Sequence, residues 1–353
     1  MRQYLTLLML AGLLPAAAHA APTAAVAPGI DFGHEDWTVA CDNTRTCRAA
    51  GYQRDDGDSE PVSILLTREG GPGQPVTATA MLGQYDETTL PQTLRLQING
   101  TALGPLEYNA GDGTAELSAK QVAALLAALN RDSRIVLVGD DGRQWTVSDR
   151  GASAVLLKMD EFQGRLGTPG ALVRKGTRAE ASVLPALPVP VIVLGRTVPT
   201  RPADLALADA PALRAALVAA TPADECEALR PDGTMFGDEG PQDITVQRLS
   251  TGKLLVSQSC WRAAYNTGDG YWVVNDRAPY APTLVTASAV DDDLRTIQEA
   301  HKGRGLGDCW HTTSWGWTGT TFVKTAEAGS GLCRLVAAGG AWDMPTLVTN
   351  VQP

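Results

Sequence analysis

Histidine, positive charge and long apolar runs are all scarce in this chain, and each shortage excludes a class of function. The 353 residues include 4 histidines. Beyond the amino-terminal leader, the histidines are His34, His301 and His311, which have no metal-like spacing, and no Gly-x-Ser-x-Gly elbow occurs. A hydrolase triad needs a nucleophile, a base and an orienting group, so the sequence contains no catalytic signature. Paired glycosidase carboxylates have no fixed spacing and stay open.

Negative charge outweighs positive charge. The chain has 29 lysines and arginines against 39 aspartates and glutamates, a formal net charge of −10. One short basic cluster stands out, at His301-Lys302-Gly303-Arg304. Nucleic acids and anionic lipid surfaces demand larger clusters of Lys and Arg. We therefore expect neither of them as a partner.

Metal-binding patterns are missing as well. No Cys-x-x-Cys pair occurs, which argues against a zinc site. The acidic runs Asp55-Asp56-Gly57-Asp58 and Asp291-Asp292-Asp293 lack the twelve-residue loop and terminal glutamate of a calcium-binding hand. The sequence predicts no metal and no cofactor.

The apolar run at the amino terminus has the layout of an export signal. Arg2 precedes an apolar core from Leu5 to Leu14, and Ala18-His19-Ala20 fits a small-x-small cleavage site. The core is shorter than the roughly 20 residues that a membrane helix needs. We predict a signal peptide over residues 1–20, cleaved after Ala20, and a flexible lead-in over 21–29. The protein is expected to have no membrane span and to be periplasmic, with secretion as the alternative.

A proline-rich stretch divides the remaining chain. Prolines at this density disrupt helices and central strands, and a chain of this length favours two domains. The prediction is an amino-terminal domain over 30–176, a proline-rich linker over 177–205 with a possible edge strand at Val189–Leu194, and a carboxy-terminal domain over 206–353. The prolines are Pro185, Pro188, Pro190, Pro199 and Pro202.

Both domains show the short, turn-bounded runs of antiparallel strands. Trp37–Cys41 alternates like a strand, Asn99-Gly100 predicts a hairpin turn, and a last strand is expected at Leu332–Ala337. A capping box at Ser118 opens one helix. The stripe Val155, Met159, Phe162 and Leu166 predicts a second. The fold class is α+β, predominantly antiparallel β, with two disulfide-braced domains and a few packed helices.

The second helix carries charges that could be taken for a site. Glu161 and Arg165 have the spacing of an ion pair on a solvated face. Asp160 and Glu161 could instead be an acid pair for catalysis. Adjacent helix residues point in different directions, which favours the solvated face.

Six cysteines follow the leader, in keeping with an oxidising compartment. Six cysteines allow 15 pairings. The domain division and the hairpin geometry favour three local pairs: Cys41 with Cys47, Cys226 with Cys260, and Cys309 with Cys333. On the chain-entropy model the longer loops each add roughly 3.5 kcal/mol of stability.

The most suggestive region is Cys309–Phe322. In a regular strand His311, Trp315 and Trp317 lie on one face with Cys309. An exposed face would make a stacking platform for sugar rings or an anchor for a protein partner, with Lys302 and Arg304 in the preceding basic loop. A buried face would make it core. We favour core, because a disulfide cysteine on the same face marks the inner side, and we expect Trp261, Trp272 and Trp342 to join it.

Several motifs resemble one family of exported proteobacterial proteins, catalogued as domain of unknown function number 1176. In the first half they are Trp37-Thr38-Val39-Ala40-Cys41-Asp42 with Cys47 and Gly51-Tyr52, and Met159-Asp160-Glu161-x-Gln163-Gly164-Arg165 with Gly167-Thr168 and Ala171-Leu172-Val173. In the second half they are Cys260-Trp261-x-Ala263-Ala264-Tyr265-Asn266, Gly305-Leu306-Gly307-Asp308-Cys309, Trp315-x-Trp317-x-Gly319 with Phe322, and Cys333-Arg334. The likeness spans nearly the whole mature chain. The opening block is also similar to invasion-associated locus B type domains, over the first strands.

The resemblance implies compartment and class more than chemistry, because the family has no settled activity. His311 and the two threonines after it depart from the family's commonest pattern. This departure argues against His311 as a shared catalytic residue.

The leading functional hypothesis is a non-catalytic binding or interaction protein of the cell envelope. Its partner would be a periplasmic protein or an envelope glycan. One alternative is a hydrolase of peptidoglycan or polysaccharide, and another is a carbohydrate-binding module acting through Trp315 and Trp317. The sequence gives no basis for an oligomeric state.

Overall fold

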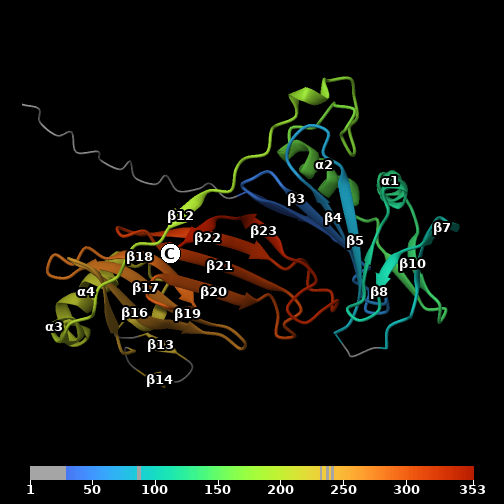
Figure 1. The fold of residues 1–353 in the computed structure, drawn as a ribbon. Coiled ribbons are helices and arrows are strands. Elements are labelled where there is room, and N and C mark those ends of the chain that lie inside the picture. Colours follow the sequence, from blue (N-terminus) through green and yellow to red (C-terminus); the bar gives the residue numbers. More distant parts are fainter. Residues whose placement is uncertain (1–28, 86–88, 231–232, 236–237, 240–241) are drawn as a thin grey trace, which may run out of the picture.

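The computed structural model describes residues 29–85, 89–230, 233–235, 238–239 and 242–353. The predicted signal peptide and all but the last residue of the lead-in lie outside this range. The described chain folds into mostly antiparallel sheets with four short α-helices (Figure 1). The predicted α+β class, dominated by antiparallel sheet, is confirmed.

Two sheets and two helices form the first half of the molecule. The larger sheet has seven strands, in the spatial order β1 (Ile30–His34), β2 (Trp37–Cys41), β3 (Cys47–Tyr52), β4 (Val62–Arg68), β5 (Val76–Leu82), β9 (Thr114–Glu116) and β8 (Glu107–Asn109). We call it the first sheet. The smaller one has the order β11 (Gln144–Val147), β10 (Ile135–Gly139), β6 (Leu94–Ile98) and β7 (Thr101–Pro105). The predicted Asn99-Gly100 turn joins β6 to β7, both residues having positive φ.

The main core lies between these sheets and the helices α1 (Ala119–Ala128) and α2 (Ala152–Phe162). The predicted capping box forms at the start of α1, where Ser118 and Gln121 bond reciprocally. Trp37 is one of two tryptophans in this core and donates from Nε1 to the Ser148 carbonyl at 2.7 Å. Its ring lies so close to Gly51 that a Cβ there would come within 2.1 Å of Trp37 Cε2. The glycine of the Gly51-Tyr52 motif is therefore required by packing.

An extended segment links the two halves. It contains the short 3₁₀ helix Glu180–Ser182, strand β12 (Val191–Val193), helix α3 (Pro202–Leu205) and a 3₁₀ turn at Ala206–Asp209. The expected strand within the proline-rich stretch forms as β12. It pairs in parallel with β24 (Asn350–Gln352) near the carboxy terminus.

The second half contains two more sheets. It opens with α4 (Pro211–Ala220), a 3₁₀ turn at Glu227–Leu229 and a small hairpin of β13 (Thr234–Met235) and β14 (Asp238–Glu239). The four-stranded sheet has the order β15 (Thr245–Ser250), β16 (Lys253–Arg262), β17 (Thr267–Asn275) and β18 (Thr283–Ala289). The five-stranded sheet has the order β19 (Asp291–Asp292), β20 (Thr296–Lys302), β21 (Trp310–Trp317), β22 (Phe322–Gly329) and β23 (Met344–Leu347).

Two cores stabilise this half. One packs α4 against one side of the four-stranded sheet around the fully buried Trp272, with Trp261 partly buried beside it. These two tryptophans were expected in the same core as Trp317, but they lie in a separate core on the other side of the sheet. The other lies between the four- and five-stranded sheets and includes Trp317. All three predicted disulfides are confirmed: Cys41–Cys47, Cys226–Cys260 and Cys309–Cys333.

Residues 330–343 join the two halves. The predicted strand at Leu332–Ala337 does not form. Instead this crossing segment, as we call residues 330–343, covers the outer face of the first sheet, where Val336 and Ala341 pack with Ala40 and Tyr52. The expected strand at Trp37–Cys41 forms as β2, and all five of its residues are buried. The physical reason is that this strand carries core on both of its faces.

Hydrogen bonds hold the crossing segment against the first sheet. The Tyr52 hydroxyl accepts from the Leu332 amide at 3.2 Å, and Gln53 Nε2 donates to the Arg334 carbonyl at 2.7 Å. The Trp342 indole donates to Ser63 Oγ at 2.7 Å. The segment is thus attached by polar bonds as well as by apolar contact.

Replacing Tyr52 by Phe should weaken this attachment. The change removes the acceptor of the Leu332 amide, and losing such a partner costs about 1–2 kcal/mol. The measurement is the free energy of unfolding by urea. Tyr108→Phe is the matched control, because the Tyr108 hydroxyl is buried without a partner among the described residues. It should be neutral or slightly stabilising, and equal losses in both variants would contradict the role assigned to Tyr52.

Candidate functional site

The exposed tryptophan platform on β21, which was the alternative to a buried face, does not form. Trp317 is fully buried between the four- and five-stranded sheets, within contact distance of Phe322, with ring centroids 5.4 Å apart. Trp315 is half-buried against the same core. The favoured core interpretation therefore describes both residues better than an exposed stacking surface does.

His311 lies at the exposed end of the same face. Its Nε2 is 3.8 Å from Glu327 Oε1 and 3.5 Å from Thr313 Oγ1. A catalytic histidine uses one nitrogen toward the nucleophile and the other toward the orienting acid. Because both contacts of His311 use the same nitrogen, these three residues do not form a relay.

The other described histidines are not in a relay either. His301 contacts the Ser288 carbonyl through Nε2 at 2.7 Å, and its ring packs at a tilt against Trp261. His34 is the last residue of β1 and is exposed. The described residues therefore place no histidine between a nucleophile and an acid.

The two basic site candidates, Lys302 and Arg304, have separate surroundings. Arg304 donates from Nε to Asp308 Oδ1 at 2.7 Å and also pairs through Nη2 with Oδ2 of the same carboxylate. The Asp308 carboxylate also accepts from the Leu335 amide at 2.7 Å. Lys302 places its Nζ 5.5 Å from the ring centre of Trp310. Arg304 thus braces the crossing segment, whereas Lys302 lies beside a tryptophan.

That tryptophan belongs to a groove on the opposite face of β21. The groove has a volume of about 310 Å³ and is lined mostly by apolar surface. Trp310 and Trp342 are its two large side chains, and Ala328 and Gly329 of β22 also line it. The remaining lining residues are Thr312, Ser330, Gly339 and Asp343. We call this the tryptophan groove.

Hydrogen bonds fix both indoles of the groove. Trp310 Nε1 donates to the Gly307 carbonyl at 3.0 Å, and Trp342 Nε1 is held by Ser63 of β4. Both rings are half-buried. The expectation that Trp342 joins the core around Trp317 is wrong, because its ring packs on the outer-face core of the first sheet and also lines the groove. With both nitrogens bonded, the rings offer the groove carbon surface in a set orientation.

The charges around the groove do not form a hydrolytic pair. Asp343 is the single carboxylate among its described lining residues, whereas glycoside hydrolysis commonly uses two carboxylates. Asp308, Cys309 and Cys333 are close enough together to resemble a metal site. Both cysteines are in a disulfide, so they supply no thiolate ligand.

Sequence patterns alone missed Trp310, Thr312 and Trp342. Trp310 and Thr312 lie on the opposite face of the strand from Trp315 and Trp317. The sequence-based prediction followed the face of Trp315 and Trp317 and therefore did not select them. The available signal was that Trp310 directly follows a disulfide cysteine. Trp342 could not be placed from sequence, because it reaches the groove through the irregular crossing segment.

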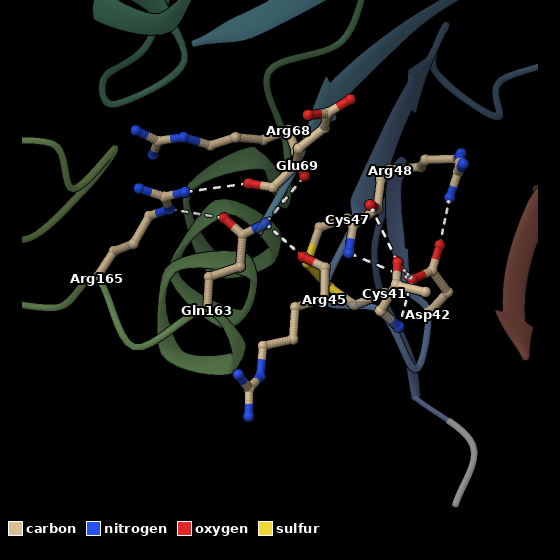
Figure 2. Close-up of a disulfide and its surroundings, with 11 residues drawn as sticks. Cys41, Asp42, Arg45, Cys47, Arg48, Arg68, Glu69, Gln163 and Arg165 are labelled. Carbon is tan, nitrogen blue, oxygen red and sulfur yellow. Dashed lines mark hydrogen bonds and ion pairs between the residues drawn. A yellow bond between two sulfur atoms is a disulfide. The ribbon is translucent and has the colours of Figure 1, made fainter. Parts of the chain in front are cut away.

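Gln163 and Arg165 form a buried anchor, shown in Figure 2 beside the Cys41–Cys47 disulfide. Arg165 is fully buried and donates from Nη2 to the Gly71 carbonyl at 2.7 Å and from Nε to Gln163 Oε1 at 2.7 Å. Gln163 in turn donates to the carbonyls of Arg45 and Arg68 at 2.8 and 2.9 Å. The anchor therefore ties the end of α2 to the hairpin of the first disulfide and to the loop after β4.

The predicted solvated face is wrong for this helix end. Arg165 pairs with Glu180 at 3.3 Å, and Glu161 pairs with Lys158 at 2.8 Å, so the expected Glu161–Arg165 pair does not form. Asp160 is buried and accepts from the amides of Leu172 and Val173. Burial raises the pKa of Asp160 above its ordinary value, although these amide bonds oppose the shift. The helical spacing of Glu161 and Arg165 gave a wrong prediction because α2 ends in a loop that folds back over the helix.

Replacing Arg165 by Lys should destabilise the fold. Lysine cannot reproduce the planar fork that reaches several acceptors, and the buried Gly71 carbonyl would lose its donor, at a cost of about 2 kcal/mol or more. Urea unfolding would measure the change. Arg134→Lys, at an exposed arginine, is the control and should stay within about 0.5 kcal/mol of the wild type. An unchanged Arg165→Lys variant would contradict the anchor role.

The Arg304–Asp308 pair predicts a pH-dependent contribution to stability. Burial raises the pKa of Asp308, but the bonds from Arg304 and the Leu335 amide outweigh it and leave the pKa below its ordinary value of 3.8. The pair therefore stabilises the folded protein fully above that value and loses this effect as the pH falls through the lower folded pKa. Asp308→Asn should cost about 1–2 kcal/mol at neutral pH, and the difference from wild type should shrink below about pH 4.

Urea unfolding at pH 7, 4 and 3 would measure this dependence. Asp132→Asn, at an exposed carboxylate, is the control. It shows how much removing a solvent-exposed carboxylate changes the stability at each pH. A wild-type advantage over Asp308→Asn that stays constant down to pH 3 would contradict the assignment.

No helix among the described residues is long and apolar enough to cross a membrane.

Comparison with known proteins confirms the family resemblance. A family model described as "Protein of unknown function (DUF1176)" matches residues 31–349. The uncharacterized protein YpfG of Escherichia coli (strain K12) is 27% identical over 341 residues, which cover 88% of this chain and 90% of that protein. A solved structure of invasion associated protein B from Bartonella henselae is 11% identical, with a TM-score of 0.27, over 38% of this chain and 99% of that one. The chain belongs to the DUF1176 family of proteins of unknown function.

Proposed function

We propose that this protein is a non-catalytic binding protein of the cell envelope and that its ligand binds in the tryptophan groove. The groove itself is the observation that carries the proposal. It is preformed, mostly apolar and bordered by a few polar groups, which are the usual properties of ligand sites.

The surroundings of the groove support rigid binding. Trp310 is anchored next to the Cys309–Cys333 disulfide, and its amide donates to Ser330 Oγ at 2.7 Å. The Ser330 amide returns a bond to the Trp310 carbonyl at 2.9 Å. Both walls are therefore fixed before a ligand arrives, which lowers the entropic cost of binding.

The side-chain chemistry favours binding over turnover. His311 makes both of its polar contacts through one nitrogen, and the groove has one carboxylate among its described lining residues. The amino-terminal leader supports a periplasmic location, where envelope polymers and exported proteins are the available ligands. Hydrolysis of such polymers is the competing function, and the mass of the bound ligand separates the two.

Native mass spectrometry can test whether envelope ligands bind in the groove. The mature protein would be incubated with separate low-molecular-weight fractions of a peptidoglycan digest, lipopolysaccharide-core sugars and periplasmic peptides. We expect an adduct whose ligand mass stays unchanged over hours. Thr312→Arg, at an exposed groove residue, should abolish it by placing a long charged side chain in the groove.

The matched control is Thr101→Arg, at an exposed threonine of β7 in the other half of the molecule. It should bind like the wild type. Loss of the adduct in Thr312→Arg alone supports the proposal. No adduct from any fraction, or equal adducts in both variants, would overturn it. Shortened ligand masses that depend on the protein would establish the hydrolase instead.

A further inference from the structure

The floor of the tryptophan groove restricts the kind of ligand that it can hold. Strand β22 is paired on both edges at this point: Ala328 lies opposite Thr312 of β21 on one side and Pro345 of β23 on the other. An extended peptide binds a sheet most readily by adding to a free strand edge. Because the floor strand has no free edge here, its ligand must be held by side chains rather than by backbone pairing.

The side chains that line the tryptophan groove are suited to binding a flat ring. Trp310 and Trp342 supply carbon surface, and their nitrogens are already bonded to Gly307 and Ser63. Ala328 and Gly329 leave the floor without bulky groups. A pyranose ring has an apolar face of C–H groups and a rim of hydroxyls, so it can lie against an indole and still bond outward.

The polar groups around the groove match that rim. Thr312, Ser330 and Asp343 line it with two hydroxyls and one carboxylate. A carboxylate accepts strong, charge-assisted hydrogen bonds from hydroxyl groups. The volume of about 310 Å³ is at the small end for ligand pockets, which suits a short stretch of a chain rather than a folded partner.

The charge of the site argues against an anionic ligand. Asp343 is exposed at the groove, and the whole chain has a net charge of −10. Lys302 lies over the Trp310 ring but is not among the residues that line the groove. Phosphorylated or acidic ligands would therefore meet repulsion without a matching cation in the groove.

We propose that the tryptophan groove binds a neutral glycan, with a pyranose ring packed against both Trp310 and Trp342 and its hydroxyls bonded to Thr312, Ser330 and Asp343. This inference rests on the proposed function, since it names the ligand class of the same site. It also moves the sugar-binding surface from the buried Trp317 to the opposite face of β21.

Titration calorimetry with defined probes tests the ligand class. The neutral probes are cellotetraose, maltotetraose and chitotetraose, and the comparison probes are tetragalacturonate and a capped tetra-alanine peptide. We expect at least one neutral tetrasaccharide to bind saturably and the comparison probes to give no binding. Trp310→Ala should weaken the glycan about tenfold or more, whereas Trp310→Phe, which keeps an aromatic face, should weaken it much less.

A second variant guards against misfolding of the tryptophan mutants. Ala328 shares the groove face with Thr312, and Ala328→Leu would fill the floor while keeping an apolar strand residue. It should reduce glycan binding about tenfold or more with an unchanged unfolding midpoint. Saturable glycan binding that survives Ala328→Leu would overturn the inference.

The two proposals fail in different ways. If none of the neutral tetrasaccharides binds but Thr312→Arg still abolishes an envelope adduct, the groove is a ligand site and the glycan assignment is wrong. The glycan assignment is equally wrong if tetragalacturonate or the peptide binds as tightly as the neutral glycans. If Thr312→Arg changes no envelope adduct, both proposals are wrong.

Discussion

The structure depends on the burial of the outer face of the first sheet by the crossing segment. Strands β2 and β3 carry apolar side chains on both faces, so the sheet would expose Ala40, Ala50 and Tyr52 to water if the segment were absent. Covering that face requires residues 330–343 to leave the five-stranded sheet and cross between the halves of the molecule. The tryptophan groove lies where they leave it, between β21, β22 and Trp342.

The polar bonds of this crossing explain why it is irregular. A segment that covers a sheet face without joining its ladder needs partners for its own amides and carbonyls. Tyr52 and Gln53 supply two of them at the end of β3, and the Asp308 carboxylate supplies another from the loop before β21. Ser63 of the first sheet binds the Trp342 side chain. The Cys309–Cys333 disulfide then closes the loop that contains Trp310. Stability and the shape of the groove thus come from the same contacts.

Two predictions about sites failed for different physical reasons. The charges around Arg165 were expected on a solvated face, but Arg165 is buried. Helical spacing carries no information about a loop that returns over the helix and covers it. The alignment of Trp315 and Trp317 on one strand face was correct, and so was the preference for core. Strand parity shows which residues share a face, but which of two faces stays open depends on sheets and segments far away in the sequence.

The sequence by itself determined the fold class, the three disulfide pairs, the capped helix α1 and the family, because these follow from local periodicity, turn chemistry, cysteine order and motifs. The tertiary structure decided which tryptophans are accessible. Trp310 and Trp342 are 32 positions apart in the sequence, and they line one groove only because residues 330–343 must bury the apolar outer face of a sheet formed nearly 300 residues earlier. Neither the sequence around Trp310 nor the sequence around Trp342 indicates that the crossing segment covers this distant sheet.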